Sequence, residues 1–142
     1  SVYCLADQVV YITWCLSVDE TVRPEIVSTG LCEAILSAVH SHILQFSVAA
    51  NGINLIKELA MNRDISVFLG SQCACELVIE VLTVHSTVLD IIDSCIATVN
   101  QLVLTCFENK CRFQKLGLEN LISNILKTNT DMSFTLHHKM ES

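Results

Sequence analysis

The chain has 142 residues, of which 51% are hydrophobic, and its 8 Lys and Arg against 15 Asp and Glu give a formal net charge of −7. This length and apolar content fit one domain with a buried core and exclude a disordered chain. The negative charge repels a phosphate backbone, so nucleic acid is excluded as the expected partner. Because the chain has only four Gly and one Pro, it has too few turn signals for many short strands, and the composition favours helices.

The first half of the chain predicts four helices. Residues 8–16 form an apolar stretch that we interpret as the last helix of a repeat whose beginning is missing. Pro24 suits the first turn of a short helix over residues 23–29. A medium helix is expected from Glu33 to residue 42 and a long one over residues 43–61, because apolar residues recur there at helical spacing.

The same order of short, medium and long helices recurs in the second half. Glu33, Glu76 and Glu119 stand 43 residues apart, and each opens a predicted medium helix, the later two over residues 75–85 and 118–128. Short helices are expected at residues 64–70 and 110–115, and a long one at 88–107. The two long helices align at 47 residues, which predicts an insertion of about four residues after His85. A period of this size is typical of solenoids, whose units bury their apolar faces against neighbouring units.

The long helix over residues 88–107 has about the length of a membrane span. Four polar or charged residues interrupt it, namely Asp90, Asp93, Asn100 and Gln101. Such groups are costly in hydrocarbon, so we expect a helix buried against other helices and no membrane span.

The stretches that lead into the medium helices resemble a known family. They read VRPEIVSTGLCE at residues 22–33, FLGSQCACELV at 68–78 and NKCRFQKLGL at 109–118. Each is similar to the inter-repeat stretch of armadillo proteins, in which Asn-Arg, two variable residues, Leu-Gly, two more residues and Gly precede the second helix. Cys73 stands in place of the usual Gly, and Val22 in place of the usual Asn. The resemblance implies an all-α, armadillo-like right-handed α-solenoid of about three helical repeats, with a HEAT-like relative as the alternative.

This interpretation predicts a repeat domain over residues 1–129 and a polar, mobile tail over residues 130–142. The domain consists of a partial repeat at 1–18, repeats at about 19–61 and 62–108, and a partial repeat at 109–129. Because neither end has an evident polar cap, we expect the chain to continue in a longer protein or to self-associate through its repeat ends.

Asn54 and Asn100 are the candidate binding residues, with Gln101 as an alternative because the 47-residue register pairs it with Asn54. In armadillo proteins that bind extended peptides, the third helices line a concave surface where an Asn clamps the main chain of the ligand. One carboxamide offers both a donor and an acceptor to a backbone unit. The alternative is that each amide is simply solvated or bonded to a neighbouring group of its own helix.

Most of the eight cysteines lie within apolar helical patterns, where Cys acts as a small buried hydrophobe. We therefore expect reduced thiols and a cytoplasmic or nuclear location. Cys73 and Cys75, with His85 and Cys111, could form a zinc site, but they lack the two close pairs typical of one, so no metal and no cofactor is expected. His42 and His85 end the medium helices, where His bonds free carbonyls and complements the helix dipole.

The sequence contains no recognisable grouping of nucleophile, base and phosphate-binding loop, so we expect no catalytic residue and no enzymatic activity. The leading hypothesis is a non-enzymatic scaffold that binds a partner protein or an extended peptide on its concave face. One alternative is a compact helical bundle with a Cys/His metal or small-ligand site. A second is a small-GTPase regulator of armadillo type.

Overall fold

The protein is all-α, as the sequence predicts. The computed structural model describes the backbone of residues 23–141 and the side chains of residues 25–131, and this part contains helices and turns without a strand. The helices are α2 (Arg23–Ser28), α3 (Leu31–Ser41), α4 (Phe46–Leu59), α5 (Arg63–Ser71), α6 (Ala74–Val84), α7 (Leu89–Thr105), α8 (Phe107–Lys115) and α9 (Leu118–Glu141).

The predicted order of short, medium and long helices is confirmed for α2 to α7. Predicted and observed bounds agree within three residues, because the apolar positions that define each helix also form its buried face. The exception is α9, expected over residues 118–128, which continues to Glu141. The expected tail boundary at residue 130 therefore lies inside a helix.

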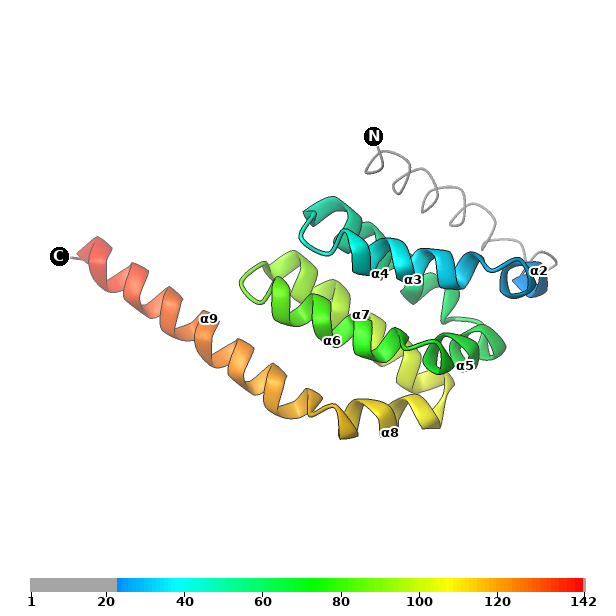
Figure 1. The fold of residues 1–142 in the computed structure, drawn as a ribbon. Coiled ribbons are helices and arrows are strands. Elements are labelled where there is room, and N and C mark those ends of the chain that lie inside the picture. The colour runs from blue at the N-terminus through cyan, green and yellow to red at the C-terminus, as the bar shows by residue number, and fades with distance from the viewer. Residues whose placement is uncertain (1–22, 142) are drawn as a thin grey trace.

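Corresponding helices pack against each other in successive layers (Figure 1). Helix α2 contacts α5, which in turn contacts α8. Helix α3 contacts α6, and α4 makes the most extensive contact in the described chain with α7. The core between these helices consists of buried aliphatic side chains and thiols, among them Ile35, Ile56 and Leu82.

The register of the long helices differs from the expected one. Helix α4 begins at Phe46 and α7 at Leu89, an offset of 43, and the buried positions follow the same offset: Val48 and Ile91, Ala49 and Ile92, Gly52 and Cys95, Ile56 and Val99, Leu59 and Leu102. The four-residue insertion predicted after His85 is therefore wrong. Helix α7 is longer because it ends later, with 17 residues against 14 in α4.

The residue before each medium helix has left-handed backbone geometry. Gly30, Cys73 and Gly117 have φ values of 78°, 68° and 74°. Glycine adopts this geometry without steric cost, whereas the Cβ of Cys73 opposes it. The Cys73 that stands in place of the usual Gly thus occupies a left-handed backbone position, and the two corresponding positions are Gly. The first turn that follows contains Glu33, Glu76 or Glu119, as predicted.

A buried polar network fixes α8 to α5 in the preceding layer. Asn109 is fully buried, and its Nδ2 lies 3.2 Å from the carbonyl oxygens of Ser66 and Leu102. Its Oδ1 accepts from Nη1 of Arg112 at 2.8 Å. A Cβ on Gly70 would overlap Asn109 and Arg112, so glycine at that position allows their close approach.

The helix predicted at residues 8–16 and the partial repeat at 1–18 lie outside the described residues. The repeat boundary at 61/62 falls between α4 and α5, whereas the boundary at 108/109 falls inside α8. Within residues 23–141, no single helix is both long and apolar enough to cross a membrane. Only α5 and α6 together, bent by 73° at the break between them, have that length and composition.

Candidate protein-binding face

The candidate binding residues lie on α4 and α7, which pack against each other through buried apolar side chains and also approach closely at two threonine hydroxyls. Oγ1 of Thr98 lies 3.2 Å from the carbonyl oxygen of Ile53, and Oγ1 of Thr105 lies 3.0 Å from that of Ala60. Both pairs have an offset of 45 residues, so the two helices run parallel and advance together. This pair forms a continuous surface, because the buried stripe of each helix faces inward and the opposite stripe faces solvent.

The structure places Asn54 and Asn100 on the exposed stripe of this pair, with Gln101 half-buried beside Asn100. The contact offset of 45 puts Asn54 level with Val99, so the amides occupy the same stretch of the α4–α7 surface. Among the described side chains, no hydrogen bond engages these three amides. They are thus available to a ligand or to water.

The three residues are not repeat equivalents, contrary to the 47-residue register. At the observed offset of 43, Asn54 corresponds to Ala97, and Asn100 and Gln101 correspond to Lys57 and Glu58. The amides therefore form a staggered group on two helices and not a ladder of identical positions.

Asn51 is a further exposed amide on α4 that the sequence analysis missed. It lies three residues before Asn54 and hence on the same helix face. The signal in the sequence was the three-residue spacing of Asn51 and Asn54, which places both amides on one helix face. We call the surface formed by Asn51, Asn54, Asn100 and Gln101 the amide face.

Exposed apolar side chains flank the amide face at both ends of the helix pair. Phe46 and Leu89, which are 51% and 64% exposed, begin α4 and α7. Met61 and Leu104, which are 59% and 80% exposed, lie at the other end. Each pair is 43 residues apart, so the two helices present the same order of apolar, amide and apolar surface.

His42 and His85 have structural roles. They are the residues that follow α3 and α6, and their backbone N–H groups, not the side chains that the sequence predicted, donate to the carbonyl oxygens of Ala38 and Val81. Nε2 of His85 lies 2.6 Å from the carbonyl oxygen of Ile43. Since a carbonyl only accepts, Nε2 carries the proton, and His85 links the α6–α7 connection to the preceding layer.

The buried thiols are packing residues. Burial raises the pKa of Cys32 to about 11, and the adjacent carboxylate of Glu33 adds to this shift. Burial also raises the pKa of Cys75 and Cys95, each to about 12. The two thiols of the Cys73-Ala74-Cys75 segment have different surroundings, because Cys73 is exposed and Cys75 is buried. Within the described part of the chain, no three His, Cys, Asp or Glu residues are grouped to hold a metal ion.

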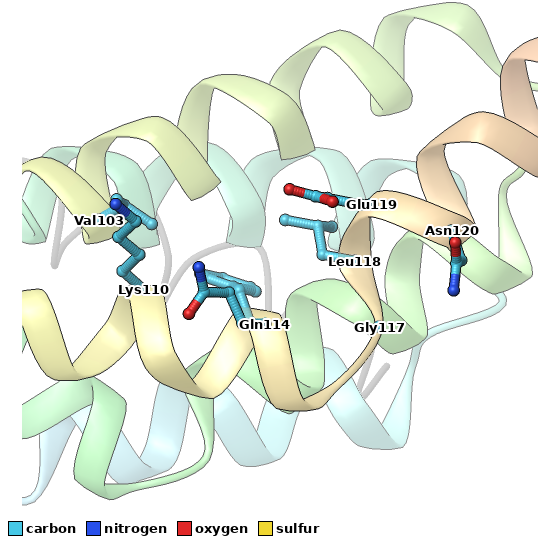
Figure 2. A pocket seen from close by; sticks show the side chains of 8 residues that line it. Val103, Lys110, Gln114, Gly117, Leu118, Glu119 and Asn120 are labelled. Atoms are coloured by element: carbon cyan, nitrogen blue, oxygen red, sulfur yellow. The ribbon is translucent and has the colours of Figure 1, made fainter.

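A cavity of about 330 Å³ lies where α7, α8 and α9 meet. Figure 2 shows the side chains that line it, with Val103 from α7, Lys110 and Gln114 from α8, and Leu118 and Glu119 from α9. Lys110, Gln114 and Glu119 are exposed, so the cavity is open to solvent and has a polar margin.

A groove of about 460 Å³ separates α3 from α6. It lies on a different surface from the amide face, because none of its lining residues belongs to α4 or α7.

These features define an all-α protein with a candidate binding face on a parallel helix pair. No family model, curated protein or solved structure matches the chain.

Proposed function

We propose that the protein is a non-enzymatic scaffold that binds a partner protein through an extended segment lying on the amide face. In this proposal the helices form an armadillo-like right-handed solenoid, with α2–α4 and α5–α7 as two units and α8–α9 as part of a third. Support comes from the stacking of α2 on α5, α5 on α8, α3 on α6, and α4 on α7. In addition, a residue with left-handed backbone geometry precedes each of the three medium helices.

The observation that carries the proposal is the group of four amide side chains on one exposed helix pair. An extended segment has unpaired backbone donors and acceptors, whereas a helix satisfies its own. A carboxamide supplies both kinds of partner, so the amide face suits an extended main chain better than a helical one. The exposed apolar residues at each end add contact area for side chains of the partner.

The ionisation of the cysteines supports a role without nucleophilic catalysis. A catalytic thiol requires a lowered pKa, and the three described thiols with shifted pKa values are all shifted upward. Reduced, buried thiols also agree with a cytoplasmic or nuclear location. No observation favours the small-GTPase regulator, and the divergent surroundings of Cys73 and Cys75 count against a Cys/His metal site.

The test compares partner capture by the wild-type protein with capture by Asn54→Ala plus Asn100→Ala. A matched control carries Asn120→Ala plus Asn124→Ala, which removes two exposed amides from α9. Quantitative mass spectrometry of cell lysates and an assay with extended peptides selected by display measure binding. We expect the amide-face variant to lose binding about thirtyfold while the control retains it, since each of the two amides contributes on the order of 1 kcal/mol through its hydrogen bonds. Equal binding by both variants would refute the assignment of the amide face.

A further inference from the structure

The groove between α3 and α6 has an apolar floor and an acidic rim. Leu36 and Leu77 form the floor and are 8% and 6% exposed. The rim has three carboxylates, those of Glu33, Glu76 and Glu80. Most of the exposed lining is carbon, so the groove is more than a cluster of acidic groups.

Within the lining of this groove the only basic side chain is His40. Its Nδ1 lies 3.1 Å from Oε2 of Glu80, and this contact bridges α3 and α6 across the groove. Glu33 and Glu76 have no ion pair with another described side chain, and both carboxylates lie in the first turn of their helices. The groove therefore has negative charge that the surrounding protein does not neutralise.

We propose that this groove is a second docking surface, which binds a segment of a partner protein rich in Arg or Lys. The stems of Arg and Lys are aliphatic and cover apolar surface, while their charged heads remain at a polar margin. An apolar floor bordered by carboxylates matches both parts of such a side chain. Arg suits the rim best, because its guanidinium binds a carboxylate with two parallel hydrogen bonds.

The repeat places carboxylates where they can pair with more than one basic residue of the partner segment. Glu33 and Glu76 occupy the same position in successive layers, so a segment that crosses from α3 to α6 meets a carboxylate in each layer. The net charge of −7 also favours the approach of a cationic partner and disfavours nucleic acid and anionic membranes. This surface is separate from the amide face, and the inference does not depend on the proposed function.

The probe is a fluorescein-labelled peptide of about ten alternating Arg and Ala residues, with a Gln and Ala peptide of the same length as control. Fluorescence anisotropy at about 0.15 M salt measures the Kd, because distant surface charges are largely screened there. We expect the Arg peptide to bind and the Gln peptide not to bind. The absence of binding by the Arg peptide would overturn the proposal.

Two variants of equal charge separate the groove from general attraction. Glu33→Gln plus Glu76→Gln removes two rim carboxylates, and Glu25→Gln plus Glu119→Gln removes two exposed carboxylates elsewhere. Each changes the net charge from −7 to −5. We expect the first variant to raise the Kd about fivefold, the effect of losing two ion pairs at a partly exposed site, and the second to change it less than twofold. Equal effects would show that overall charge and not the groove attracts the peptide.

Cys73 provides an independent readout because it is exposed and lines the groove. Bound peptide should slow alkylation of Cys73 at least threefold and leave the half-buried Cys111 on α8 unaffected. Ser37→Arg, which places a guanidinium within the groove, should abolish both binding and protection. Unchanged alkylation of Cys73 in the presence of saturating peptide would place the peptide elsewhere and overturn the proposal.

Discussion

Replacement of Asn109 by Ala tests whether the buried polar network holds the last layer in place. The side chain is fully buried, and Nδ2 donates to carbonyl oxygens of α5 and α7 while Oδ1 accepts from Arg112. Two neutral hydrogen bonds contribute about 1 kcal/mol each, and the bond to the half-buried guanidinium about as much, since water can replace its partner. Asn109→Ala should therefore lower the free energy of unfolding by about 3 kcal/mol.

Urea denaturation followed by circular dichroism at 222 nm measures this change, and thermal unfolding should show a decrease in Tm of about 9 °C. Asn54→Ala and Asn100→Ala are matched controls, because they remove the same group from exposed positions and should cost less than about 0.5 kcal/mol. A cost at Asn109 that equals the cost in the controls would refute the reasoning that this network connects α8 to α5.

Two further predictions concern the cysteines. Cys73→Gly should stabilise the protein by about 1 kcal/mol in urea denaturation, because it relieves the left-handed strain at φ 68°, and an unchanged or lower stability would contradict that account. In native protein at pH 8, Cys73 should react rapidly with Ellman's reagent, whereas the buried thiols with raised pKa should react only after unfolding in urea. Rapid labelling of the buried thiols in native protein would show that they are accessible and contradict this prediction. These protected thiols are Cys32, Cys75 and Cys95.

The helices of this protein are predictable from sequence because each buries one face. The recurrence of Glu33, Glu76 and Glu119 located the starts of the medium helices, and the apolar residues around them set the extent of α3 and α6, but not of α9, to within a few residues. The register of the long helices was less predictable. Apolar residues are so frequent in this chain that both 43 and 47 residues give matches, such as Leu55 with Leu102, and only burial distinguishes the two.

The candidate site depended on that register. Asn54 and Asn100 were singled out as polar residues on apolar helices, and their exposure agrees with that reasoning. The staggered arrangement of the amides required the correct offset, whereas Asn51 could be recognised from its spacing to Asn54 on the same helix. The burial of Asn109 was not predictable, because α8 is polar in sequence and the space for this side chain comes from Gly70, 39 residues earlier.

Three polar side chains on α8 and α9 disfavour self-association through the exposed surface that they form. The side chain of Asn109 packs against Ser66, Gly70 and Cys75. Helices α5 and α8 begin 44 residues apart. At this offset, the residues that correspond to Ser66, Gly70 and Cys75 are Lys110, Gln114 and Glu119. A further unit docked there would bury one positive and one negative charge, at a cost that its apolar contacts would have to exceed.

Self-association through the repeat ends stays a prediction, and these three polar side chains are the reason to expect that this surface takes no part in it. Light scattering should therefore detect no self-association that depends on this surface. Lys110→Ser, Gln114→Gly and Glu119→Cys together restore the smaller residues of the preceding layer, and they should produce concentration-dependent association. A wild-type protein that associates, and that Lys110→Glu converts to a monomer, would show instead that this surface binds a second copy despite its charges.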